Sequence, residues 1–152
     1  MTEPVRQIGA PDGTLLLDLL VIQRAVGDLL EAALGETGVR PVEYAVHGQL
    51  AKGPLTPREL SALLGLPPST LTGVLRALEE RGDTERTADP RDRRSYRVAL
   101  TRAGKRRHTE ARRRFRVALD LLHEELPDDA GEARALLLRI DEALGRARDR
   151  LS

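Results

Sequence analysis

The residues with the most distinctive chemistry form one short polar stretch, Ala88-Asp89-Pro90-Arg91-Asp92-Arg93-Arg94. Its three guanidinium groups stay charged at physiological pH and match the geometry of phosphate oxygens. Residues 81–116, which contain this stretch, hold 14 Lys and Arg against 5 Asp and Glu, a net charge of +9 in a chain of net charge +1. Such a concentration is typical of a face that binds nucleic-acid phosphates. The alternative is a solvated helix face.

Residues for catalysis or metal binding do not form a known arrangement. The chain has no cysteine, which excludes a disulfide framework, a thiolate metal site and a switch by cysteine oxidation. Its histidines, at 47, 108 and 123, lack metal-ligand spacing. The sequence contains no nucleophile elbow, phosphate-binding glycine loop or zinc-hydrolase helix. We therefore expect no enzyme, no metal site and no cofactor.

Two short helices precede the basic stretch. The first is predicted to begin with Thr56 as N-cap, Pro57 at the first helical position and Glu59 completing a capping box, and to end at Gly65. The second is predicted over residues 69–81, with apolar residues at helical spacing on its inner side. Its outer side carries Ser69, Thr70, Thr72, Gly73 and Arg76. Two short helices joined by a tight turn are the helix-turn-helix pattern.

The apolar period changes from helical to alternating after Gly82. Residues 84–87 and 95–100 are predicted strands, and the basic stretch is the turn between them. A hairpin that follows directly on a helix-turn-helix is a wing.

Longer helices flank this region. Residues 15–34 are apolar nearly all round, which is typical of a helix buried on every side, and a chain of this size is expected to need a partner subunit to bury it. Thr101 is the predicted N-cap of a long helix, and a last helix is predicted from about residue 130 to 150. The apolar run at residues 19–22 is interrupted by Asp18 and Gln23, so we expect neither secretion nor a membrane span, and a cytoplasmic protein.

Together, five segments resemble the multiple-antibiotic-resistance regulator (MarR) family in order and spacing. They are Leu55-Thr56-Pro57-Arg58-Glu59-Leu60, Ser69-Thr70-Leu71-Thr72, Leu78-Glu79-Glu80-Arg81-Gly82, Asp89-Pro90-Arg91-Asp92-Arg93-Arg94 and Leu100-Thr101-Arg102-Ala103-Gly104. The resemblance implies a mainly α fold, in which a winged helix-turn-helix lobe with a two-stranded β wing is joined to N- and C-terminal dimerisation helices. We expect a single domain over 1–152, with dimerisation helices at 12–35 and 119–151, the DNA-binding lobe at 41–101 and a long connecting helix at 101–126.

The resemblance also implies a function, that of a sequence-specific DNA-binding transcriptional regulator. The expected protein is a ligand-responsive repressor that binds double-stranded DNA as a homodimer on a pseudo-palindromic operator. The DNA-binding residues it implies are Ser69, Thr70, Thr72 and Arg76 in the major groove and Arg91, Asp92, Arg93 and Arg94 at the wing. Arg94 would enter the minor groove while Asp92 braces it, since an extended guanidinium suits the negative potential there.

Four further residues, Tyr44, His47, His108 and Phe115, are candidates for lining a small-molecule effector pocket; the alternative is that they are ordinary core positions. Three residues depart from the family pattern. Pro67 replaces a polar N-cap, Gly73 a larger polar residue, and Asp83 the first of an apolar pair. A carboxylate near the DNA side is expected to weaken binding. These departures motivate an alternative function, a winged-helix protein-interaction module that has lost specific DNA binding.

Overall fold

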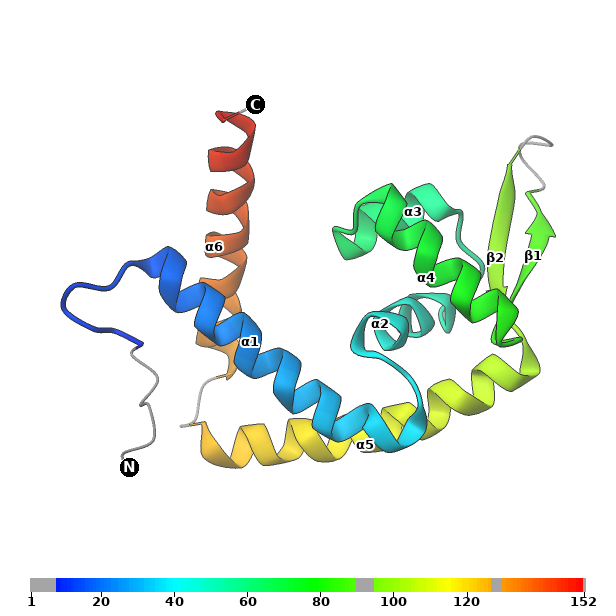
Figure 1. The fold of residues 1–152 in the computed structure, drawn as a ribbon, viewed down its shortest axis with the longest axis horizontal. Helices are drawn as coiled ribbons and strands as arrows, with labels where there is room; N and C mark the ends of the chain where they lie inside the picture. The colour runs from blue at the N-terminus through cyan, green and yellow to red at the C-terminus, as the bar shows by residue number, and fades with distance from the viewer. Residues whose placement is uncertain (1–7, 90–94, 127–129, 152) are drawn as a thin grey trace. The chain divides into compact units, whose positions relative to one another are not determined.

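The computed structural model describes residues 8–89, 95–126 and 130–151. The chain forms two compact units, residues 1–116 and 117–152, and each is described by itself. The elements, labelled in Figure 1, are α1 (Leu15–Leu34), a short 3-10 helix η1 (Gly35–Thr37), α2 (Pro41–Leu50), α3 (Pro57–Leu64), α4 (Pro68–Glu80), β1 (Thr84–Ala88), β2 (Tyr96–Leu100), α5 (Arg102–Glu125) and α6 (Ala130–Asp149). The expected fold class, mainly α with a two-stranded wing, is confirmed.

The start of α3 has the predicted capping box. The Thr56 hydroxyl accepts a hydrogen bond from the Glu59 N–H (3.2 Å), and the Glu59 carboxylate accepts one from the Thr56 N–H (2.7 Å). Pro57 occupies the first turn. Gly65 ends the helix in the left-handed conformation (φ 63°), which glycine adopts without steric cost.

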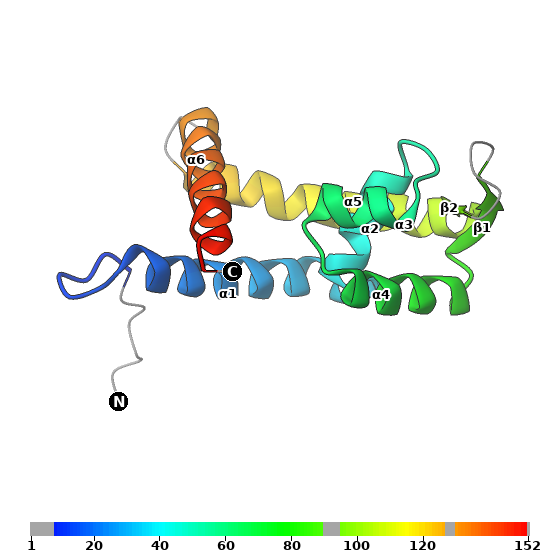
Figure 2. The same cartoon turned by 90° about the horizontal axis from the view of Figure 1, so that it is seen from above.

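A single core holds α2, α3, α4 and the hairpin together. The buried side of α4 contributes Leu71, Val74, Leu75 and Leu78, and these pack with Val46, Leu50, Leu60, Val98 and Leu100. Figure 2 shows the same elements from above, with the hairpin following directly on the end of α4. This core fixes the outward side of α4 relative to the stem of the wing.

The wing stem is a regular antiparallel pair, from Thr84 opposite Leu100 to Ala88 opposite Tyr96. Leu55, in the segment before α3, adds a bridge to Val98 through two backbone hydrogen bonds of 3.1 and 2.8 Å. The helix-turn-helix and the wing are therefore connected through the backbone as well as through the core.

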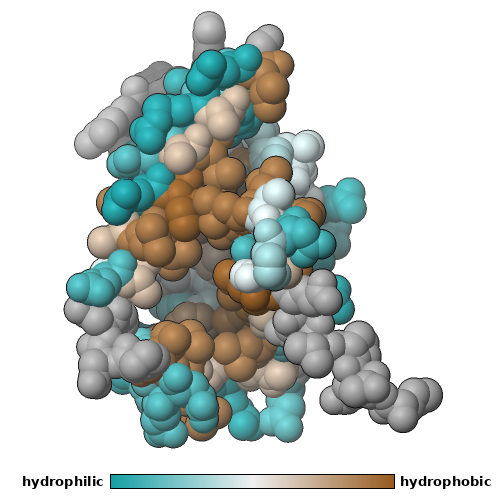
Figure 3. All heavy atoms as spheres, turned by 90° about the vertical axis from the view of Figure 1, so that its left-hand side faces the viewer, coloured by the Kyte–Doolittle hydropathy of each residue, from teal (hydrophilic) through white to brown (hydrophobic). Residues whose placement is uncertain are grey.

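Many leucines of α1 are exposed in a single chain, although the helix is apolar on most sides. The exposed apolar residues of this helix are Leu15, Leu16, Leu17, Leu20, Ile22, Val26 and Leu29. In the second unit, α6 exposes Leu136, Leu137, Leu138 and Leu144. Figure 3 shows apolar side chains gathered over a broad area of the surface. None of the described helices combines the length and hydropathy that crossing a bilayer requires.

The start of α5 is fastened to the residues that precede β1. As predicted, Thr101 caps α5: its hydroxyl accepts a hydrogen bond from the Gly104 N–H (3.0 Å). The same hydroxyl donates to the Gly82 carbonyl (2.6 Å), and the Thr101 N–H donates to the Asp83 carbonyl (3.0 Å). Gly104 lies so close to Asp83, the residue before β1, that a Cβ atom on it would overlap the Asp83 carbonyl group. The approach of α5 to the wing stem therefore requires glycine at this position.

Replacing Gly104 tests this contact. Gly→Ala in a helix usually stabilises by about 1 kcal/mol, but Gly104→Ala is expected to lower the free energy of unfolding by about 1–3 kcal/mol because the methyl group displaces backbone. The measurement is urea denaturation. Gly73→Ala, on the exposed side of α4 with open space around the added methyl, is the matched control and should be stabilising. An equal change in the free energy of unfolding in the two variants would contradict the close approach of Gly104 to the Asp83 carbonyl.

Candidate nucleic-acid interface

The four predicted DNA-binding residues of the second short helix lie on the exposed side of α4. Ser69, Thr70, Thr72 and Arg76 all face away from the core. The Thr72 hydroxyl donates to the Pro68 carbonyl (2.8 Å), and the Arg76 guanidinium lies 3.6 Å from the Glu80 carboxylate with both side chains largely exposed. An exposed pair of this kind contributes little stability, so Arg76 can exchange Glu80 for another anion at small cost.

The predicted wing residues Arg91, Asp92, Arg93 and Arg94 lie outside the described residues. Their contacts with DNA, and the bracing of Arg94 by Asp92, stay predictions. The structure describes the two strands of the stem on either side of these residues. Next to the strands, the Asp89 N–H donates a hydrogen bond to the Ser95 carbonyl (3.3 Å).

Several arginines of the basic segment 81–116 form ion pairs within the protein. Those paired with carboxylates of other parts of the fold are Arg81, Arg97 and Arg107, which are largely sheltered, and Arg86 and Arg114, which are about half exposed. By contrast, Arg102, Lys105 and Arg106 are exposed at the start of α5 and form no ion pair within the part of the chain that the structure describes. The net charge of this segment therefore overstates the charge that is free to meet DNA.

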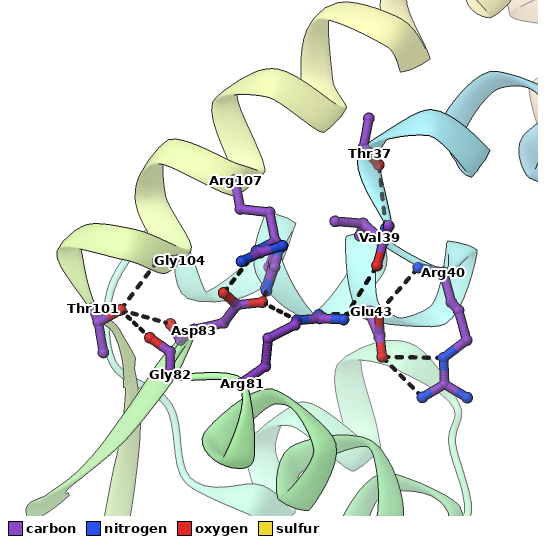
Figure 4. A network of polar contacts seen from close by, with 12 residues as sticks. Thr37, Val39, Arg40, Glu43, Arg81, Gly82, Asp83, Thr101, Gly104 and Arg107 are labelled. Atoms are coloured by element: carbon purple, nitrogen blue, oxygen red, sulfur yellow. Dashed lines mark hydrogen bonds and ion pairs between the residues drawn. The ribbon is translucent and has the colours of Figure 1, made fainter.

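Asp83 is fully buried and holds two of these arginines (Figure 4). Its Oδ2 accepts a hydrogen bond from Arg81 Nε (2.8 Å) and its Oδ1 accepts one from Arg107 Nε (2.9 Å). Asp83 therefore does not present a free carboxylate on the DNA side, as its sequence position had suggested, because it is buried and paired with two guanidinium groups. Its sequence context beside Gly82 gave no sign of burial.

The network continues from Arg81 to a second buried carboxylate, that of Glu43 in α2. Arg81 donates to Glu43 Oε2 (3.1 Å) and to the Gly38 carbonyl (3.2 Å), and the Arg40 guanidinium donates to Glu43 Oε1 (2.8 Å). Burial alone would raise the pKa of Glu43, but the hydrogen bonds from Arg40 and Arg81 outweigh it and hold this pKa below its ordinary value. Sequence reasoning missed this network, whose partners are distant in the chain.

His47, on the same helix, lies beside the network without joining it. Its ring is fully buried, its Nε2 is 3.5 Å from Asp83 Oδ2, and neither ring nitrogen has a hydrogen-bond partner among the described residues. Burial lowers the pKa of His47 to about 4, against the opposing influence of Asp83 and with a smaller contribution from His108. At neutral pH the imidazole is therefore uncharged.

The structure brings the four effector-pocket candidates together between α2 and α5. The Tyr44 ring stacks on His108 at 5.5 Å and on Phe115 at 4.8 Å between centroids, and His47 meets His108 edge-to-face at 6.1 Å. Burial lowers the pKa of His108, and Arg112 lowers it further. We call these four residues the aromatic cluster. Among the described residues, no group of His, Asp and Glu is arranged to hold a metal ion.

The buried neutral histidine predicts a pH dependence of stability. Unfolded His47 binds a proton near its ordinary pKa of 6.5, whereas folded His47 does not until about pH 4, so stability falls as the pH falls through this window. Between pH 7.5 and 5 the free energy of unfolding should drop by about 2 kcal/mol. His47→Gln should remove most of this slope in urea denaturation, and His123→Gln, at an exposed position, should keep it. An unchanged slope in His47→Gln would show that His47 is charged or accessible in the native state.

Comparisons with known proteins agree with this architecture. The MarR family model matches residues 51–96, which span α3, α4 and β1 and reach the first residue of β2. The comparison with curated proteins found no match. Among solved structures, CouR from Rhodococcus jostii RHA1 bound to p-coumaroyl-CoA is 27% identical with a TM-score of 0.67, over 97% of this chain and 93% of that one.

Two other solved structures extend the comparison. A MarR-family transcriptional regulator from Rhodococcus sp. RHA1 is 29% identical with a TM-score of 0.64, over 88% of this chain and 94% of that one. A transcriptional repressor, CouR, bound to a 23-mer DNA duplex is 24% identical, with a TM-score of 0.74 over 93% and 99% of the two chains, and shows the same fold. The capped α3, the polar outer side of α4 and β1 fall within the matched region, and in this region the chain is similar to the MarR family, as it is over most of its length to solved structures of MarR-family transcriptional regulators.

Proposed function

We propose that this regulator is a repressor that binds a pseudo-palindromic operator as a homodimer, in the cytoplasm, and leaves it when a small molecule binds. The observation that carries the proposal is the exposed polar side of α4, held rigidly beside a hairpin whose turn contains three arginines. A helix of this kind fits the major groove, and the turn of the hairpin can reach the adjacent minor groove.

The N-terminus of α4 supports a phosphate contact. Pro67 precedes the helix and supplies no side-chain cap, so the N–H groups of Ser69 and Thr70 have no capping side chain. Free N–H groups at a helix N-terminus bind phosphate oxygens well. Gly73, exposed in the middle of the same helix, offers no side chain for reading a base. We therefore propose that affinity depends more on the wing and on phosphate contacts than on direct base contacts.

One of the three sequence features that motivated the alternative function, a protein-interaction module, no longer supports it. Asp83 is a buried structural residue and so gives no argument against DNA binding. Pro67 is compatible with DNA binding for the reason just given. No further observation favours the alternative.

DNA binding is tested with a labelled duplex from upstream of the regulator's own gene. Fluorescence anisotropy should show a specific complex whose affinity falls linearly, on logarithmic scales, with added salt. Arg94→Ala should weaken it by about 1–3 kcal/mol, because the guanidinium no longer enters the minor groove. Arg113→Ala, a largely exposed arginine paired with Glu110, is the control. Absence of any specific complex at micromolar protein would favour the interaction module.

Exposed leucines support the proposed dimer. The dimerisation regions at 12–35 and 119–151 contain the apolar residues that α1 and α6 expose in a single chain. Burying one leucine side chain contributes about 1.5–3 kcal/mol, and monomers seldom leave extended apolar surfaces open to water. A second copy of the chain is the proposed cover. In this arrangement, residues 41–101 form the DNA-binding lobe and residues 101–126 the connecting helix.

A charge placed on α1 tests the dimer. Leu16→Glu should shift the protein toward monomer in sedimentation-velocity experiments and weaken operator binding, because a carboxylate would be buried in the interface. Leu63→Glu is the matched control, since the two leucines are 60% and 59% exposed in one chain and Leu63 belongs to α3. A Leu16→Glu protein that remains dimeric would exclude this surface.

The aromatic cluster is the proposed effector site. Its rings stack on one another and its buried histidine nitrogens have no hydrogen-bond partner among the described residues, so a ligand with an aromatic ring that entered the cluster would meet both stacking partners and polar atoms. CouR, which has the same fold, is bound to p-coumaroyl-CoA, a ligand with such a ring. Because His47 lies 3.5 Å from Asp83, a ligand in the cluster would act close to the residues that join α4, the wing and α5.

A further inference from the structure

The Arg97 side chain, in β2, connects three parts of the lobe. Its guanidinium donates a hydrogen bond to the Pro54 carbonyl (2.9 Å). It also forms ion pairs with the Asp89 carboxylate (3.4 Å) and with the Glu59 carboxylate (3.8 Å). The Arg97 side chain is only 21% exposed and that of Asp89 is 7% exposed, so their ion pair is sheltered from water, whereas Glu59 is 45% exposed.

The three acceptors lie at places that determine the wing's position. Pro54 directly precedes the bridge between Leu55 and Val98. Glu59 belongs to the capping box that starts α3 and hence the helix-turn-helix. Asp89 is the last described residue of the stem before the basic turn. One planar guanidinium therefore ties the end of the stem to the start of the DNA-reading helices.

The opposite face of the hairpin has its own attachment. Arg86, which points away from the Arg97 face because strand residues alternate, donates to the Glu79 carboxylate of α4 (2.9 Å) and lies 4.7 Å above the Tyr96 ring. A hairpin of two strands is marginally stable by itself. With Arg86 on one face and Arg97 on the other, the stem is held to α4 and to α3.

We propose that Arg97 is a positioning residue for DNA binding: it fixes the stem of the wing relative to α3 and α4 and does not itself contact DNA. The inference rests on the proposed function, because it takes the wing to be a DNA-contacting element. It assigns to Arg97 a role distinct from that of the arginines in the turn, although all of them belong to the same basic segment.

The direction in which Asp89→Asn changes the affinity for DNA distinguishes a positioning role of Asp89 and Arg97 from a purely electrostatic one. Asp89→Asn removes a negative charge near the DNA and, if charge alone mattered, would strengthen binding. If Asp89 and Arg97 position the wing together, the same substitution weakens binding. Arg97→Lys is a second such test, because lysine keeps the charge but has no planar group that can bind several acceptors at once. Lysine should therefore preserve DNA affinity if Arg97 binds a phosphate, but not if Arg97 positions the wing.

The experiment measures operator affinity by anisotropy for Arg97→Gln, Arg97→Lys, Asp89→Asn and the Arg97→Gln/Asp89→Asn double variant. Each single variant should lose about tenfold in affinity, and the double variant should lose no more than either single one, since residues that share one interaction are not additive. Arg113→Gln, which removes an exposed charge, is the matched control. Tighter binding by Asp89→Asn, additive losses or rescue by Arg97→Lys would overturn the proposal.

A second readout does not depend on DNA. Hydrogen exchange of the wing-stem amides, including the Asp89 N–H, should become faster in Arg97→Gln while the amides of the α4 core remain protected. Unchanged exchange in the stem would overturn the positioning role even in a protein that binds its operator. If the wild type binds no specific DNA but Arg97→Gln still loosens the stem, the proposed function fails and Arg97 still positions the wing structurally.

Discussion

The buried carboxylate of Asp83 is the constraint on which the rest of the first unit depends. Removing a carboxylate from water costs several kcal/mol, which only well-placed donors can offset. The donors are Arg81, at the end of α4, and Arg107, in α5. The Asp83 carbonyl also accepts a hydrogen bond from the Thr101 N–H and lies close to Gly104. These contacts join the end of α4, the start of the wing stem and the start of α5 at one buried residue.

This arrangement connects two regions with different chemistry. On one side, α4 presents polar groups to solvent; on the other, the aromatic cluster buries rings and an uncharged histidine. Asp83 lies within 3.5 Å of His47 and is hydrogen-bonded to the residue that ends α4. A rearrangement of the aromatic cluster therefore acts on the Asp83 carboxylate, and leaving this buried charge without its partners would cost several kcal/mol of stability. The basic segment serves the same architecture, since Arg81, Arg97 and Arg107 form ion pairs with carboxylates of other parts of the fold.

Local patterns in the sequence predicted the elements well. The Thr56 and Glu59 capping box, the Thr101 cap and the change from helical to alternating period all depend on neighbours within a few residues, and all are present in the structure. The polar outer side of α4 was predictable for the same reason, because helical spacing alone decides which residues share a face. The role of Asp83 was misjudged, since its neighbours along the chain carry no information about burial.

By itself, the sequence determined the order and type of the helices and strands, the resemblance to the MarR family, and which residues of α4 face outward, because these follow from short-range spacing and capping. Only the tertiary structure decided which charges are internal. Arg81 and Glu43 are 38 residues apart, Arg107 and Asp83 are 24, and Arg97 and the Pro54 carbonyl are 43. Whether a guanidinium binds a buried carboxylate or remains free for a phosphate depends on what distant segments bring beside it. That is a property of the packed chain and not of the local sequence.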